Sequence, residues 1–102
     1  MNAFSIVGKI TDMPMLKETS IGLKTCGLPM RVQRNFPKSE GVYESDDVIV
    51  EVWRGLAETV SASCKIGDYV GINGRIHSRK YQKDDRVYLN YGFVAEKVDF
   101  LR

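Results

Sequence analysis

The sequence has few of the residues from which disulfides and metal sites are built. Its 102 residues include two cysteines, Cys26 and Cys64, and one histidine, His77. The cysteines do not form a CxxC pair, so two reduced thiols are expected rather than a disulfide or a metal site. Because a structural metal needs about four ligands, a lone histidine does not complete a site, and no metal or other cofactor is predicted.

Long apolar runs are also missing. No stretch approaches the roughly 20 apolar residues of a transmembrane helix. The N-terminus, MNAFSIVGKITD, has no basic segment followed by the long apolar segment of a secretory signal. The protein is therefore expected in the cytoplasm, without a membrane partner.

A strong excess of one charge is absent as well. The chain has 15 Lys and Arg against 13 Asp and Glu, and this net charge of +2 neither requires nor excludes a polyanionic partner. Hydrophobic residues make up 43% and charged residues 27%, the balance of an ordinary globular chain. A single domain over residues 1–102 is predicted, long enough for a modest core.

What the sequence does contain is period-two alternation of apolar and polar residues, which predicts five β-strands. They fall at 4–10, 24–34, 47–53, 69–81 and 86–100, with a polar loop at 35–47. Pro29 inside the second strand predicts an edge or a bulge, because proline cannot donate to a strand ladder. Gly92 in the last strand predicts a bulge.

The segment 54–64, RGLAETVSASC, breaks this alternation. Its apolar residues Leu56, Val60 and Cys64 recur every four positions, which predicts a short helix. Three strands, a helix and two strands is the order of the OB-fold, a small and partly open barrel. The predicted fold class is therefore all-β, a five-stranded OB-fold barrel with one short helix between strands three and four.

The only tryptophan falls on an unexpected face of its strand. In VIVEVW, residues 48–53, the alternate valines form the obvious core face, which places Trp53 on the side of Glu51, toward solvent. A tryptophan there needs a cover. The cover could be a nucleic-acid base, another subunit or another part of the same chain.

The strand at 69–81 has one apolar face and one face with cations and aromatic rings. The second face carries Tyr69, Arg75, His77, Arg79 and Tyr81. Because cations follow phosphates and every base can stack on a ring, this combination is typical of a site for single-stranded nucleic acid. The alternative is a solvated face whose arginines pair with Glu51 or Asp47. Other aromatic residues are open to a stacking or a structural role: Phe36, Tyr43, Tyr88 and Tyr91.

Five segments, in order, resemble bacterial single-stranded DNA-binding proteins. MNAFSIVGKIT, followed by Pro14, resembles the opening strand of that family, and GLKTCGLPMRVQR resembles its second strand. VEVWRGLAE resembles its passage from strand to helix, KIGDYVGINGRIHSRKY its fourth strand, and FVAEKVDFL its closing strand. The resemblance runs from Asn2 to about Leu101, nearly the whole chain.

This resemblance implies which side chains bind DNA. Bases would stack on Trp53, Tyr81 and Phe36. Phosphates would contact basic side chains at Lys9, Arg31, Arg34, Arg54, Arg75 and Arg79, to which we add Lys80 beside the hairpin. One stacking position of the family falls on Asp47, which cannot stack a base. No enzyme is predicted, because the chain has no supported nucleophile–base pair and no P-loop.

The implied function is binding of single-stranded DNA without sequence specificity, which would protect it in replication, recombination or repair. The implied assembly is a nucleoid-associated homotetramer, with a dimer as second choice. Replication proteins remain possible partners, although nothing here resembles the acidic C-terminal tip that recruits them in the family. The alternative is a primosomal accessory protein of the same fold, a short dimer acting mainly through protein contacts. The missing tip and Asp47 favour that alternative, whereas Trp53 and Tyr81 disfavour it.

Overall fold

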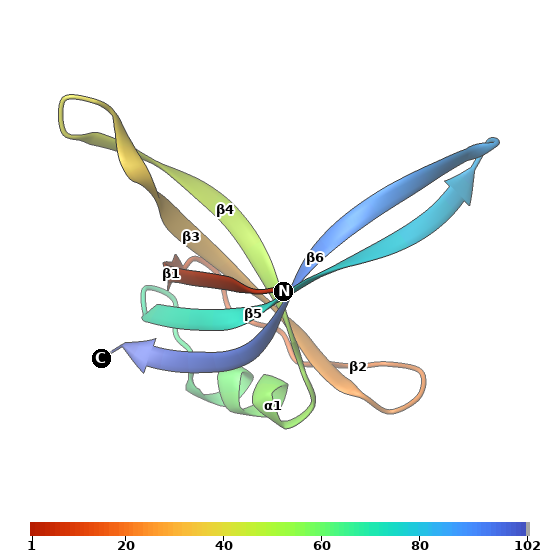
Figure 1. The fold of residues 1–102 in the computed structure, drawn as a ribbon. Helices are drawn as coiled ribbons and strands as arrows, with labels where there is room; N and C mark the ends of the chain where they lie inside the picture. The colour runs from red at the N-terminus through yellow and green to blue at the C-terminus, as the bar shows by residue number, and fades with distance from the viewer. Residues whose placement is uncertain (102) are drawn as a thin grey trace.

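Residues 1–101, which the computed structural model describes, form six strands and one helix. These are β1 (Phe4–Ile10), β2 (Lys17–Glu18), β3 (Lys24–Ser39), β4 (Val42–Trp53), α1 (Arg54–Ser63), β5 (Tyr69–Lys83) and β6 (Arg86–Leu101). The sheet order is β1-β5-β6-β4-β3-β2, and pairing of β1 with β3 closes the five long strands into a barrel (Figure 1). The predicted all-β barrel with one helix is confirmed, and the two-residue β2 is an addition that the sequence did not predict.

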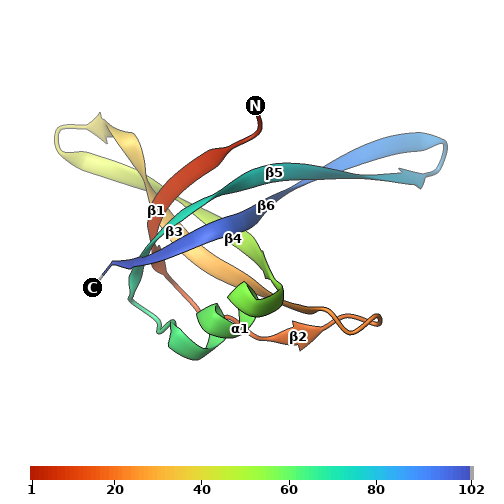
Figure 2. The same ribbon diagram turned by 60° about the horizontal axis from the view of Figure 1, so that its bottom comes forward.

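The core fills the inside of this barrel. Its largest fully buried side chains alternate along the strands and include one from the helix: Ile10, Leu28, Met30, Val50, Val52, Val60, Val70 and Ile72. Helix α1 lies under one end of the barrel (Figure 2) and buries Ala57 together with Val60. Both cysteines are buried, and neither is in a disulfide. Burial raises the pKa of the Cys26 thiol, which makes it a poor nucleophile at neutral pH.

Two long hairpins leave the barrel in different directions (Figures 1 and 2). In the first, β3 pairs with β4 as far as Ser39 and Val42, so the predicted loop at 35–47 is mostly strand. That loop prediction was wrong because both faces of the hairpin are exposed there, and exposure removes the alternation from which strands are recognised.

The second hairpin, β5–β6, ends in a tight turn at the predicted position. Asp84 and Asp85 have φ angles of 50° and 65°, and Lys83 pairs with Arg86 across the turn. Two consecutive positive φ angles are typical of the type I′ turn, whose twist matches that of the flanking strands.

Pro29 marks the end of one ladder of β3 rather than the predicted edge strand or bulge. Pro29 pairs with Ile49 of β4 on one side. On its other side, Pro29 lies at the end of the ladder with β1, where its carbonyl accepts a hydrogen bond from the N–H of Thr11 at 3.1 Å, and β3 pairs with β2 further back, at Lys24 and Thr25.

The bulge predicted at Gly92 is wrong. Gly92 pairs with His77 in regular register. The irregularity lies further along β6, where Asn73 pairs with Lys97 but Gly74 pairs with Ala95, which leaves Glu96 as the extra residue. The glycine at position 92 is explained instead by a side-chain contact, described below.

Candidate nucleic-acid interface

Trp53 lies at the end of β4, on the outside of the barrel. Val50 and Val52 are fully buried on the inner face, whereas Ile49 is exposed and Trp53 is half-buried on the outer face. The predicted side for Trp53 is therefore confirmed. The backbone of Trp53 is extended and leads directly into α1 through Arg54, whose φ of 61° is unusual for a residue other than glycine.

Three neighbouring strands contribute to the outer surface beside Trp53. Strand β6 lies between β4 and β5 in the sheet, with Gly92 paired to His77. Because Gly92 has no side chain, the His77 ring reaches across β6, and its Nε2 lies 2.7 Å from Oε2 of Glu51 on β4. Arg79 of β5 donates to the other oxygen of the same carboxylate at 3.3 Å.

The Glu51 carboxylate is held ionised by this arrangement. Its partial burial opposes ionisation, but the hydrogen bonds and charges of His77 and Arg79 outweigh that effect, so the pKa of Glu51 lies below its usual value. One carboxylate therefore organises two side chains of the neighbouring hairpin. The predicted alternative, an arginine of β5 paired with Glu51, is confirmed for Arg79.

Further along the β5–β6 hairpin, two tyrosines form a stacked pair. The ring centroids of Tyr81 and Tyr88 are 5.2 Å apart, with an angle of 17° between the rings. The two residues are register partners and both are exposed. The sequence analysis singled out Tyr81 but left Tyr88 open, although the two positions lie at equal distances from the Asp84–Asp85 turn, and this symmetry could have identified the pair.

These side chains form one continuous run on the outer faces of β4, β5 and β6. We call it the outer strip and define it as Glu51, Trp53, His77, Arg79, Tyr81 and Tyr88. It begins at the barrel, where Trp53 lies, and continues onto the β5–β6 hairpin, where the tyrosine pair lies. The strip offers aromatic faces at both ends and a hydrogen-bonded ionic cluster between them.

The basic side chains expected to contact phosphates divide into two groups. Three of them are in ion pairs with acidic residues: Arg31 with Asp47, at 3.0 Å, Arg34 with Glu44 and Asp46, and Arg79 with Glu51. Within residues 1–101, the other four have no ion pair: Lys9, Arg54, Arg75 and Lys80. The second group is therefore available to phosphates without giving up an existing partner.

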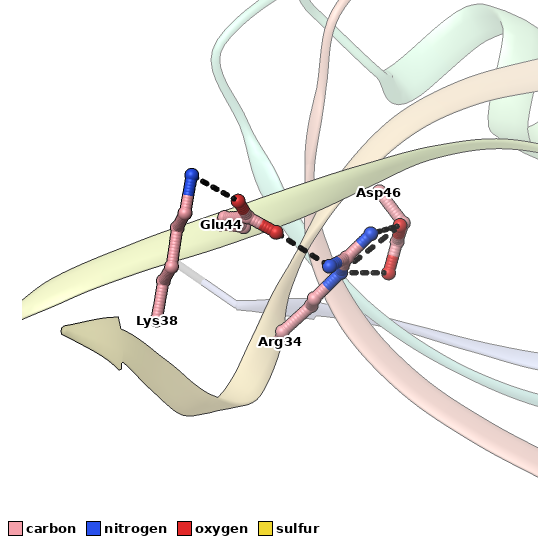
Figure 3. Close-up of polar contacts among 4 residues, drawn as sticks. All are labelled: Arg34, Lys38, Glu44 and Asp46. Carbon is pink, nitrogen blue, oxygen red and sulfur yellow. Dashed lines mark hydrogen bonds and ion pairs between the residues drawn. The ribbon is translucent and has the colours of Figure 1, made fainter.

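Arg34 is the most strongly engaged of the paired cations (Figure 3). Its Nη2 donates to Asp46 at 2.9 Å and its Nη1 to Glu44 at 2.5 Å, while Lys38 lies 3.3 Å from the other oxygen of Glu44. The hydrogen bond from Arg34 lowers the pKa of Asp46, and the same bond raises the pKa of Arg34. A phosphate would have to compete with two carboxylates for this guanidinium.

The structure does not bring Phe36 to the outer strip. Phe36 lies on the outlying part of the β3–β4 hairpin, whereas Trp53 lies at the opposite end of the same hairpin, paired with Thr25. The exposed Phe36 ring lines a hollow of about 610 Å³ between β1 and β3, together with Val7 and Arg34. Phe36 would therefore contact DNA at a point separate from the outer strip, and only if the DNA extended across the β3–β4 hairpin.

No helix within residues 1–101 is long and apolar enough to cross a membrane. No three or more His, Cys, Asp or Glu side chains come together in that range in a way that would hold a metal ion.

Comparison with known proteins gives one consistent match. The model of the "Single-strand binding protein family" matches residues 1–101. "Single-stranded DNA-binding protein 3" of Listeria innocua is 37% identical over 99% of this chain and 64% of its own length, so the chain spans less than two thirds of that relative. "Single-stranded DNA-binding protein B" of Bacillus subtilis is 35% identical over 98% of this chain and 89% of its own length.

A solved structure supports the fold. The wild-type single-stranded DNA binding protein from Thermus aquaticus superposes with a TM-score of 0.86 at 23% identity. The match covers all of this chain and 50% of that chain. At this level of identity, the likeness establishes the OB-fold barrel and no more.

Proposed function

Because the chain belongs to the single-strand binding protein family, we propose that it binds single-stranded DNA without sequence specificity. The observation that carries the proposal is the outer strip, which presents Trp53 and the Tyr81–Tyr88 pair on one continuous surface. Stacking on aromatic rings is indifferent to sequence, because every base has a flat face. Unpaired cations such as Arg75 and Lys80 lie on the same hairpin strand and would neutralise the phosphates.

In the cell this binding would protect single-stranded DNA during replication, recombination or repair, in the nucleoid region of the cytoplasm. Stacking and charge neutralisation require no cofactor and no catalytic group. The names of the relatives favour this function over that of a primosomal accessory protein.

The proposed function is tested by comparing DNA forms and salt concentrations. Oligo-dT should bind much more tightly than a duplex of equal length, since the bases of a duplex offer no exposed faces. The logarithm of the affinity should fall linearly with the logarithm of salt concentration, by about 0.7 per phosphate neutralised. Equal affinity for both DNA forms in the same buffer would contradict the proposal.

We propose in addition that the protein assembles into a homotetramer, with a dimer as second choice. Strand β1 pairs with β5 from Phe4 to Lys9 but with β3 only at Lys9 and Ile10. The N-terminal half of β1 therefore has an open edge, next to the exposed side chain of Val7. Open strand edges are ready templates for pairing, and closed symmetric oligomers are the usual result.

Light scattering at micromolar concentration tests this assembly. The expected mass is four times the 11.6 kDa of one chain. The variant Val7→Lys should have a lower assembly mass than the wild type, because a charge beside the open edge of β1 opposes pairing with another chain. A wild-type mass equal to that of one chain would overturn the assembly while leaving DNA binding to be judged by its own test.

A further inference from the structure

We propose that Glu51 is an internal counter-charge that limits the affinity of the outer strip for single-stranded DNA. Its carboxylate accepts a hydrogen bond from Nη2 of Arg79 and lies 2.7 Å from Nε2 of His77, two nitrogens that a DNA phosphate could otherwise contact. The inference rests on the proposed function. It concerns a different property, namely how tightly DNA is held rather than whether it is held.

The position of Glu51 makes it a direct competitor. It lies between Trp53 and the Tyr81–Tyr88 pair, where DNA stacked at both ends of the strip would have to cross. The side chain of Glu51 is 24% exposed and that of Arg79 is 62% exposed, so the carboxylate is the more deeply buried partner of the pair. A carboxylate and a phosphate offer the same kind of anionic oxygens to arginine, and the two therefore compete for one partner.

Within residues 1–101, no charged residue stands directly opposite Glu51 on either neighbouring strand. Across β3, its register partner is Gly27, and across β6, its register partner is Val94. Both of its ionic contacts come from β5, through His77 and Arg79. Removing the charge of Glu51 therefore frees His77 and Arg79 of β5 and breaks no ion pair on another strand.

Gly92 is the positioning residue for this cluster. A Cβ at position 92 would overlap both Nε2 of His77 and Oε2 of Glu51. These atoms are the ends of flexible side chains, so a small side chain there would push the two apart without moving the backbone. The glycine that the sequence pattern suggested as a bulge serves instead to let the His77–Glu51 hydrogen bond form.

The decisive variant is Glu51→Gln, which keeps the shape of the side chain and removes its charge. We expect it to bind oligo-dT several-fold more tightly than the wild type. We also expect its salt dependence to be steeper by up to about 0.7 in log–log slope, the contribution of one additional phosphate. The matched control is Glu58→Gln, the same chemical change at an exposed glutamate of α1 that has no ion pair within residues 1–101.

Two further variants make the test independent of one substitution. Gly92→Ala should also tighten binding. Its added Cβ would push the Glu51 carboxylate away from His77 without removing its negative charge. In the double variant Glu51→Gln with Arg79→Gln, the gain should disappear, since the released guanidinium is gone. Should Glu51→Gln fail to fold, as judged by its melting curve, Gly92→Ala carries the comparison.

The outcomes separate the two proposals. If the wild type binds oligo-dT but Glu51→Gln binds equally or more weakly, the counter-charge role is overturned. Weaker binding would indicate instead that Glu51 positions Arg79 for DNA. A gain equal to that of Glu58→Gln would overturn it as well, since it would reflect net charge alone. If the wild type does not bind oligo-dT, the proposed function fails and this inference fails with it.

Discussion

Replacing Trp53 by alanine is expected to weaken the binding of oligo-dT by about 1–3 kcal/mol, the range measured for the loss of one stacked base. The fold should persist, because Trp53 lies on the outer face of β4 while the core is filled by Val50 and Val52 on the opposite face. The affinity is measured by the anisotropy of a labelled oligo-dT, since the variant has lost the only tryptophan of the chain.

Two measurements protect this interpretation. Trp53→Phe should recover much of the affinity, because a smaller ring can still stack on a base. The melting temperature of Trp53→Ala should stay close to that of the wild type. A large fall in melting temperature, with no loss of affinity below the transition, would mean that Trp53 is a structural residue.

Gly74→Ala is expected to lower the free energy of unfolding by about 3 kcal/mol. A Cβ at this position would overlap the backbone carbonyl oxygen of Val94 and would lie 2.8 Å from Cε1 of Phe4. Unlike the end of a side chain, the backbone of β6 cannot move aside without breaking its pairing with β5. Position 74 adjoins the register shift between β5 and β6, so the loss should also disorder the hairpin that carries Tyr81.

Urea unfolding of Gly74→Ala measures this loss. The matched control is Gly71→Ala on the same strand, where a Cβ would approach Val7 no closer than 3.7 Å, an ordinary contact. The control should unfold near the wild-type midpoint. If the two variants had equal stability, the tight contact between Gly74 and Val94 would not constrain the barrel.

The barrel could be predicted from the sequence because one face of each long strand is buried inside it. Burial imposes the alternation seen at Val48, Val50 and Val52, and the same rule placed Trp53 on the outer face. Outside the barrel the rule no longer applies, and the β3–β4 hairpin was therefore expected to be a loop. Where a strand continues beyond the core, the alternation of apolar and polar residues therefore cannot predict how far it extends.

The site was predictable in its residues but not in its pairings. The types of side chain on 69–81 indicated a nucleic-acid surface. For Arg79 the sequence allowed two partners, a DNA phosphate or an acidic side chain of a neighbouring strand. Its contact with Glu51 depends on β6 lying between β4 and β5 and on Gly92 being opposite His77. The register of His77 with Gly92 follows from the position of the Asp84–Asp85 turn, but the strand order that places β6 beside β4 is specified by no local pattern.

The fluorescence of Trp53 tests the central claim most directly, because the only tryptophan of the chain reports on one position of the outer strip. The wild type is titrated with oligo-dT, and in parallel with a duplex of equal length in the same buffer. A base stacked on the indole should quench the emission in a saturable way with oligo-dT, and far less with the duplex. Unchanged emission at oligo-dT concentrations where anisotropy shows saturated binding would contradict the account, because DNA would then be held away from Trp53.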